Sequence, residues 1–126
     1  MIMKNIKMIK VTVTSARDVL NQFATALAKA RRGEKVEHSG ISFESIEGLR
    51  NVLTRRRLEL LSVIRHKKPN SVYELSKLLN RDLKSVNTDL KILKENDFVE
   101  FKKVSNGRQR IIPIVEFDKI DIMVKV

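Results

Sequence analysis

The 126-residue chain is long enough for one ordinary domain, or for a small domain with an extension. Its 42% hydrophobic and 33% charged residues are typical of a globular protein. Lys and Arg number 26 against 15 Asp and Glu, which gives a net charge of +11 and a pI near 10.2. A chain this basic attracts DNA, RNA or an anionic membrane surface, and charge alone does not choose among them.

The absence of cysteine excludes disulfides, thiolate catalysis, zinc fingers and iron–sulfur ligation, and it fits a reducing compartment. The first residues, MIMKNIKMIKV, are interrupted by Lys4, Lys7 and Lys10, so we expect no signal peptide. No apolar run approaches the roughly 20 residues of a membrane span. We therefore expect a cytoplasmic, nucleoid-associated protein.

The first third of the chain predicts a strand–helix–strand unit. Residues 6–14 are rich in β-branched side chains and read as a strand. Ser15 can cap a helix over residues 16–32, which Gly33 would end, and residues 35–43 read as a second strand. The apolar stripe of this helix consists of Leu20, Phe23, Leu27 and Ala30. That stripe can cover the domain's own core, or it can bind a second copy or another protein.

Two further helices are predicted before Pro69. Residues 43–53 carry apolar side chains at helical spacing. Thr54 can then cap a helix that runs to about His66. The apolar face of this second helix includes Leu58, Leu61 and Ile64, and is widened by Leu60 and Val63.

A short helix and a longer one follow Pro69. Ser71 and Glu74 have the spacing of a capping box, which predicts a helix start. Residues 80–82 form a tight break, and a second helix is expected over residues 82–95. Its apolar stripe is Leu83, Val86, Leu90 and Leu93.

After residue 97 the period of the pattern changes from 3.6 to 2. The runs FVEFKKV and QRIIPIV flank an Asn-Gly pair at 106–107, which predicts a hairpin over residues 98–115 with a type I′ turn. The closing residues 120–126 alternate between apolar and polar, as in a half-buried strand.

This order of elements is typical of a winged helix-turn-helix domain. We predict an α+β fold, with a winged helix-turn-helix DNA-binding domain over residues 43–126 and a strand–helix–strand extension over residues 1–42 for dimerisation or partner binding. The helix over 82–95 would then lie in the major groove, and the hairpin over 98–115 would form the wing.

The polar face of the 82–95 helix carries side chains suited to duplex DNA. Asn87 can pair with adenine, and Ser85 and Thr88 can bond either kind of base edge. Lys84 can reach guanine or phosphate, while Lys91 is placed for the backbone. With the preceding arginine, the candidate DNA contacts are Arg81, Lys84, Ser85, Asn87, Thr88 and Lys91. An ordinary solvated helix face is the alternative.

The predicted hairpin adds Lys102, Lys103, Arg108 and Arg110 as DNA contacts. Such a wing could lie along a phosphate strand, or Arg108 could enter the minor groove. The alternative is an edge hairpin whose charge protects it from aggregation.

Arg55, Arg56 and Arg57 open the helix that follows Thr54. Cations at a helix N-terminus oppose the helix dipole and one another. We expect a compensating partner, either a phosphate or an acidic protein surface. The alternative is an internal ion pair with Glu59 or another acidic group of the fold.

From Ile41 onward the sequence resembles a prokaryotic family of DNA-binding winged helix-turn-helix proteins that are similar to MarR-type regulators. The resemblance rests on LTRRRLELL, on P-x-S-x-x-E-L from Pro69, on NRDLKSVNTDLKIL and on the closing FDKIDI. Many relatives have an E-x-G-L-V pattern before the first wing strand, where this chain has Glu95-Asn96-Asp97-Phe98. Asn96 tolerates the left-handed conformation, so the helix can end there.

The resemblance implies a transcriptional regulator that binds double-stranded DNA as a homodimer at a palindromic site. Some members of the family resemble antitoxins. The alternative function is therefore an antitoxin whose N-terminal unit binds a small toxin protein while the winged helix represses the operon.

Other classes of function have little support in the sequence. His38 and His66 lie far apart, and no hydrolase, metalloprotease or phosphate-loop motif is present, so we expect no enzyme activity, no cofactor and no metal. RNA binding stays open, although one Tyr and no Trp leave few stacking platforms. A membrane role is disfavoured because the predicted core needs the amphipathic helices.

Overall fold

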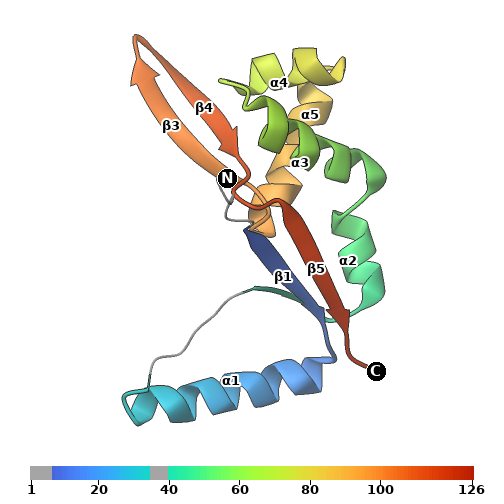
Figure 1. Cartoon of the computed structure of the whole chain (residues 1–126), viewed down its shortest axis with the longest axis vertical. Helices are drawn as coiled ribbons and strands as arrows, with labels where there is room; N and C mark the ends of the chain where they lie inside the picture. The colour runs from blue at the N-terminus through green and yellow to red at the C-terminus, as the bar shows by residue number, and fades with distance from the viewer. Residues whose placement is uncertain (1–6, 35–39) are drawn as a thin grey trace, which may run out of the picture. The chain divides into compact units, whose positions relative to one another are not determined.

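The computed structural model describes residues 7–34 and 40–126 and has a mixed α+β fold (Figure 1). The chain forms two compact units. Unit 1 consists of Met1–Arg50 together with Lys119–Val126, as far as these are described, and unit 2 is Asn51–Asp118. Among the described residues, none of the helices combines the length and the hydropathy needed to cross a membrane.

Unit 1 is built on a three-stranded parallel sheet. Its strands are β1 (Met8–Val13), β2 (Ile41–Phe43) and β5 (Lys119–Val124), in the order β2-β1-β5. Helix α1 (Ala16–Arg31) lies between β1 and β2 in the chain, because parallel strands need a crossover connection. The central strand β1 supplies the buried residues Val11 and Val13.

Most predicted elements of the N-terminal third are confirmed. The strand expected over 6–14 is β1, and the helix expected over 16–32 is α1, capped by Ser15 as predicted. The strand expected over 35–43 appears as β2 at its C-terminal end, and residues 35–39 lie outside the described residues.

The last strand, β5, belongs to unit 1 and not to the C-terminal domain predicted from the sequence. Residues 119–126 were predicted to be part of a C-terminal domain over 43–126, but β5 pairs with β1 along its whole length, from Met8↔Lys119 to Val13↔Val124. An alternating pattern defines the faces of a strand without specifying its partner. The expected half-burial is also weaker than predicted, since Ile122 and Val124 are both almost half exposed. Unit 2 is therefore inserted between two parts of unit 1.

Unit 2 follows the predicted order of helices and hairpin. Helix α2 ends in this unit, α3, α4 and α5 follow, and strands β3 and β4 pair in an antiparallel hairpin (Figure 1). The bounds are α2 Ile46–Val52, α3 Arg55–Lys67, α4 Val72–Leu79, α5 Leu83–Glu95, β3 Glu100–Asn106 and β4 Arg108–Ile114.

Each of the three helices α3, α4 and α5 begins at a side-chain cap. An oxygen of the cap residue accepts a hydrogen bond from the backbone N–H three residues later, which satisfies one of the free amides of the first turn. The cap residues are Thr54, Ser71 and Asp82, with distances of 3.3, 3.0 and 2.8 Å. The predicted capping box is partly formed, because the Glu74 carboxylate accepts from the N–H of Asn70 rather than that of Ser71.

The core of unit 2 joins all three helices to the start and end of the hairpin. Val86, Leu90 and Leu93 of α5 are at most 1% exposed, as predicted. Leu83 and Leu58 are exceptions to the predicted apolar faces, since each is 45% exposed. The buried hydrophobic side chains of the core are Val52, Leu60, Leu61, Ile64, Leu75, Val86, Leu90, Leu93, Phe98, Val99 and Val115.

The hairpin is confirmed, but its predicted type I′ turn is wrong. Ser105 pairs with Gln109 and Asn106 pairs with Arg108, so the register is centred on Gly107. A two-residue turn would place an even number of residues between paired positions, and it needs positive φ at both of them. Only Gly107 has positive φ in this turn, at +85°.

Helix α5 ends at Glu95 as predicted, but the left-handed residue that follows it is Asp97 rather than Asn96. Asn96 has φ −103°, whereas Asp97 adopts the left-handed conformation with φ +65°. The N–H of Phe98 then donates to the carbonyl of Leu93 at 2.9 Å, which closes the helix end. Asp97 occupies the position of the glycine in the E-x-G-L-V pattern, so an acidic residue carries a conformation that favours glycine.

We expect Asp97→Gly to stabilise unit 2 by about 0.5–1 kcal/mol, because glycine removes the left-handed strain at a small cost in unfolded-state entropy. Tyr73 lies in unit 2 and is the only tyrosine of a chain without tryptophan, so its fluorescence during urea unfolding reports this unit. Asp97→Ala keeps the strain and should show no gain. Equal stability of the glycine and alanine variants would contradict this interpretation.

Candidate nucleic-acid interface

Helix α5 has three distinct faces. Its inner face is the buried stripe of Val86, Leu90 and Leu93. A second face carries Ser85, which accepts a hydrogen bond from Arg81 in the turn before α5, and Asp89, which accepts one from Arg57 at the start of α3. The remaining face is exposed, and we call its four residues the outer face of α5. They are Lys84, Asn87, Thr88 and Lys91.

The side chains of the outer face are available to a partner. Among the described residues, those of Lys84, Asn87 and Lys91 make no hydrogen bond or ion pair. Thr88 donates its hydroxyl proton to the carbonyl of Lys84 at 3.0 Å, which leaves its oxygen free to accept. The outer face therefore offers donors and acceptors that the fold itself does not use.

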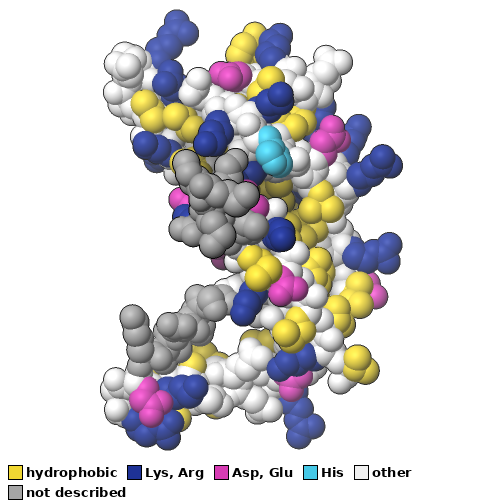
Figure 2. Space-filling view, viewed as in Figure 1, with side chains coloured by type: hydrophobic (Ala, Val, Ile, Leu, Met, Phe, Trp, Pro, Cys, Tyr) yellow, Lys and Arg dark blue, Asp and Glu magenta, His cyan; other side chains and the backbone are white. Residues whose placement is uncertain are grey.

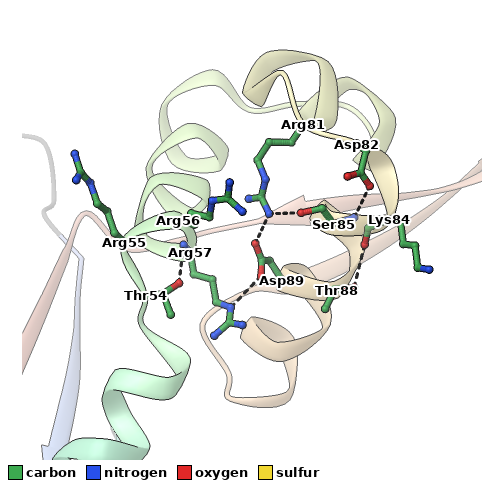
Figure 3. A pocket seen from close by; sticks show the side chains of 10 residues that line it. All are labelled: Thr54, Arg55, Arg56, Arg57, Arg81, Asp82, Lys84, Ser85, Thr88 and Asp89. Atoms are coloured by element: carbon green, nitrogen blue, oxygen red, sulfur yellow. Dashed lines mark hydrogen bonds and ion pairs between the residues drawn. The ribbon is translucent and has the colours of Figure 1, made fainter.

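The second face of α5 is fixed by a carboxylate between two guanidiniums. Oδ1 of Asp89 lies 3.1 Å from Nε of Arg57, and Oδ2 lies 2.6 Å from a terminal nitrogen of Arg81 (Figure 3). The three side chains are only 13–16% exposed. Charge-assisted hydrogen bonds in such a partly dry setting are stronger than those in water.

Both arginines of this cluster hold further groups. Arg57 also donates to the carbonyls of Asn51 and Val52, the last residues of α2, so it caps that helix end. Arg81 also donates to the hydroxyl of Ser85 at 2.5 Å. The cluster thereby ties the end of α2, the start of α3 and the turn before α5 to the buried side of α5.

The Asp89 cluster gives a structural role to several residues that were predicted to contact DNA. Arg81 was expected to contact phosphate, but its guanidinium is engaged inside the unit. Ser85 is half-buried and its hydroxyl oxygen accepts from Arg81, while its proton remains to be donated. Arg57 has the internal acidic partner that was left open as an alternative, and that partner is Asp89 rather than Glu59.

Arg55, Arg56 and Lys84 surround an open hollow beside the Asp89 cluster (Figure 3). Its volume is about 640 Å³. Five cations line it against two carboxylates, and one of those carboxylates is already shared by two arginines. The lining residues are Thr54, Arg55, Arg56, Arg57, Arg81, Asp82, Lys84, Ser85, Thr88 and Asp89. We call this the arginine hollow.

The hairpin presents its cations on two faces. Facing residues of an antiparallel pair point to the same side, and neighbours along a strand point to opposite sides. The register Lys103↔Ile111 therefore places Lys103 on one face, and the registers Lys102↔Ile112 and Val104↔Arg110 place Lys102 and Arg110 on the other. Arg108 follows Gly107 at the turn, and all four basic residues are exposed. Figure 2 shows Lys and Arg side chains projecting at the upper left, where Figure 1 draws the hairpin.

A groove of about 590 Å³ separates the hairpin from the helices of unit 2. Its lining includes Asn87 of the outer face and Lys103 and Arg110 of the hairpin. The apolar residues of its lining are Val72, Tyr73, Leu83, Val104 and Ile111. The outer face of α5 thus lies between the groove on one side and the arginine hollow on the other.

Asp89 is the residue of this site that was missed from the sequence. It lies three residues after Val86 and four before Leu93, so it falls at the edge of the buried arc of α5. A charged residue at such a position needs a partner. The surplus of arginine at 55–57 was the signal that could have revealed it.

Histidine and carboxylate clusters give no sign of a metal site in residues 7–34 and 40–126, where no group of three or more potential ligands could hold an ion. His66 is exposed, and its Nδ1 lies 2.9 Å from the carbonyl oxygen of Ser62. His38 lies outside the described residues.

A family model matches residues 52–122, which is more than half of the chain. The chain belongs to the HVO_A0114 family. The match covers nearly all of unit 2 and the first residues of β5, so the outer face of α5, the hairpin and the arginine hollow all lie in the part shared with the HVO_A0114 family. No curated protein matches the chain.

One solved structure is similar to part of this HVO_A0114 protein. It is described as the structure of the transcriptional regulator homologue protein from Pyrococcus horikoshii OT3. The two chains share 17% sequence identity with a TM-score of 0.44, over 56% of this chain and 77% of that one. A similarity this low shows no function.

We expect Asp89→Asn to destabilise unit 2 by about 3 kcal/mol, because removing one partner of a buried ion pair leaves the other charge uncompensated. Urea unfolding followed by Tyr73 fluorescence measures this loss. Glu59→Gln removes a carboxylate charge at an exposed position of α3 in the same unit and should shift stability by less than about 0.5 kcal/mol. Equal effects of the two substitutions would show that the Asp89 cluster contributes nothing particular.

Proposed function

We propose that this HVO_A0114 protein is a transcriptional regulator that binds double-stranded DNA sequence-specifically through a winged helix-turn-helix in unit 2. In this proposal α4 and α5 form the helix-turn-helix, α5 enters the major groove, and the β3–β4 hairpin is the wing. The observation that carries the proposal is the outer face of α5. Its polar side chains are exposed and unused, while the opposite side of the same helix is buried.

The dimensions of α5 suit this role. A major groove about 12 Å wide admits a single α-helix. From Lys84 to Lys91 the helix rises about 10 Å at 1.5 Å per residue. That distance corresponds to about three base-pair steps of 3.4 Å. A single copy of α5 can therefore read a half-site of three or four base pairs.

The outer face divides by chemistry into reading and anchoring residues. Asn87 is exposed and can form a bidentate pair with adenine, and Thr88 can accept from a base edge. Lys84 can reach guanine or phosphate. Lys91 lies two turns further along and is better placed for the backbone. Ser85 can still donate its proton, whereas Arg81 supports the helix from within.

The hairpin supplies the second part of the proposed interface. Lys102, Arg108 and Arg110 are exposed and can neutralise phosphates or place a guanidinium in the minor groove. Lys103 lines the groove together with Asn87. This continuity of basic side chains from α5 to the hairpin supports DNA over an isolated solvated helix face.

The proposal predicts different effects for Asn87→Ala and Lys91→Ala. Asn87→Ala should reduce the preference for the cognate duplex over a scrambled one by about 5- to 150-fold, since a bidentate pair contributes about 1–3 kcal/mol of discrimination. Lys91→Ala should weaken both duplexes alike. Fluorescence anisotropy across salt concentrations measures this, with the DNA upstream of the protein's own gene as the first cognate candidate.

Matched controls lie on α1. Asn21→Ala and Lys29→Ala remove the same side-chain types from exposed helical positions outside the proposed interface. They should leave the preference unchanged. The proposal fails if wild type binds every duplex equally, or if Asn21→Ala and Asn87→Ala have the same effect.

A second candidate function, binding of a protein partner, is favoured by α1. Leu20, Phe23 and Leu27 are 68%, 59% and 46% exposed, so they do not cover the core formed by the described residues of unit 1. A second copy of the chain is the partner that suits a palindromic DNA site. A small toxin protein is the alternative, in which case the chain would be an antitoxin.

Sedimentation equilibrium of the Phe23→Ser variant distinguishes a second copy of the chain from a toxin protein as the partner of α1. If α1 pairs two copies, wild type should be a dimer and Phe23→Ser should shift it toward monomer, whereas Gln22→Ser, its neighbour in the chain, should not. A dimer that resists Phe23→Ser would contradict the α1 interface. A monomer that co-purifies with the product of an adjacent small gene would favour the antitoxin function.

A further inference from the structure

The arginine hollow is the strongest charged feature of unit 2 outside the outer face of α5 and the hairpin. It lies on the flank of α5 that points away from the hairpin groove, since Ser85 and Asp89 line the hollow whereas Leu83 and Asn87 line the groove. Two elements far apart in sequence form it, the start of α3 and the start of α5.

The charges of the hollow are not balanced by the fold. Asp89 is shared between Arg57 and Arg81, and Asp82 uses an oxygen to cap α5 through the N–H of Ser85. Among the described residues, the side chains of Arg55, Arg56 and Lys84 have no hydrogen-bond or ion-pair partner. The hollow therefore keeps a net positive charge that an anion would compensate.

Arg56 is the arginine of the hollow best placed to receive an anion. Figure 3 shows Arg56 extending from α3 in the direction of Arg81, while Arg55 points away toward the rim. The Nε atom of Arg81 is buried and has no hydrogen-bond partner. Guanidinium groups recognise phosphate through their fork of N–H donors, and the hydroxyl of Ser85 has a proton left to donate.

We propose that the arginine hollow binds a backbone phosphate of the same DNA duplex that α5 reads, with Arg56 as the main contact and Arg55 and Lys84 at the rim. This inference rests on the proposed function. It extends the DNA footprint to the start of α3, so that the outer face of α5 is anchored to phosphates on both flanks, by the hairpin on one side and by the hollow on the other.

Continuity with the outer face favours duplex DNA as the source of this phosphate. Lys84 and Thr88 belong both to the outer face and to the lining of the hollow. The bases read by α5 and the phosphates beside them lie on the same strands. A free phosphate ion could bind the same guanidinium groups, but its binding would not depend on the contacts between α5 and DNA.

The test compares the Arg55→Gln/Arg56→Gln variant of the full chain with an Arg17→Gln/Arg31→Gln control. Both pairs are exposed, lie on helices and lose the same charge, but the control pair lies on α1. Each phosphate contact contributes about 0.9 to the slope of log K against log salt. We expect the hollow variant to lower this slope by about one or more and to weaken cognate and scrambled duplexes alike, by about tenfold at 0.1 M salt.

The control variant should lower the slope by less than about half as much, because it removes only long-range charge. Equal changes in slope for the two variants would overturn the phosphate site while leaving the proposed function intact. Wild type that binds no duplex would overturn both proposals.

An amide chemical-shift titration distinguishes the duplex from a free ion. On adding the cognate duplex, residues 54–57 should shift together with residues 84–91, and the first group should be silent in the Arg55→Gln/Arg56→Gln variant. Sodium phosphate at matched ionic strength provides the second arm. Shifts at residues 54–57 with phosphate but not with duplex would overturn the proposal and assign the hollow to a free anion.

Discussion

The ion-pair cluster of Asp89 with Arg57 and Arg81 is the constraint on which the rest of unit 2 depends. A single carboxylate of α5 accepts from one arginine at the start of α3 and from another in the turn before α5. Arg57 reaches the end of α2 as well. Because a buried charge that loses its partner is costly, this cluster favours a single orientation of α5 against the other helices. The apolar core alone would allow small rotations of such a helix.

The orientation of α5 determines which of its residues face solvent. With Asp89 held toward α3 and with Val86, Leu90 and Leu93 in the core, Lys84, Asn87, Thr88 and Lys91 are left outside. The same cluster concentrates positive charge beside this face, since two arginines share one carboxylate. A structural ion pair and a candidate binding surface are therefore produced by the same residues. This explains why Arg81 belongs to the site without being one of its outward contacts.

Local sequence signals predicted the elements of unit 2 well. The caps at Thr54 and Ser71, and the stripe of Val86, Leu90 and Leu93, depend on residues within a few positions of one another. The predictions that were wrong concern contacts between residues far apart in the sequence or the backbone conformation of single residues. The pairing of β5 with β1 joins residues more than a hundred positions apart. The partner of Arg57 lies 32 positions along the chain.

The sequence also failed to predict which of two neighbouring residues adopts the left-handed conformation after α5, and which residue lies at the centre of the hairpin turn. Either Asn96 or Asp97 could have ended α5, and the structure uses Asp97. In the hairpin, the Asn-Gly pair predicted the turn but not its register, which is centred on Gly107. The exposure of Leu83 depends on the hairpin groove, which no periodic pattern reveals. These differences move single side chains and leave the order of the elements unchanged.

Affinity cleavage from the outer face of α5 tests most directly whether this helix lies in the major groove. Because the chain has no cysteine, Thr88→Cys creates a single thiol for an iron chelate. Thr25→Cys on α1 is a matched control, since both threonines are exposed, helical and hydrogen-bonded to the carbonyl four residues earlier. If α5 lies in the major groove, the chelate at residue 88 should cleave the cognate duplex within a few base pairs of one position, and the chelate at residue 25 should give no localised cleavage. Localised cleavage from residue 25 but not from residue 88 would contradict the claim that α5 lies in the major groove.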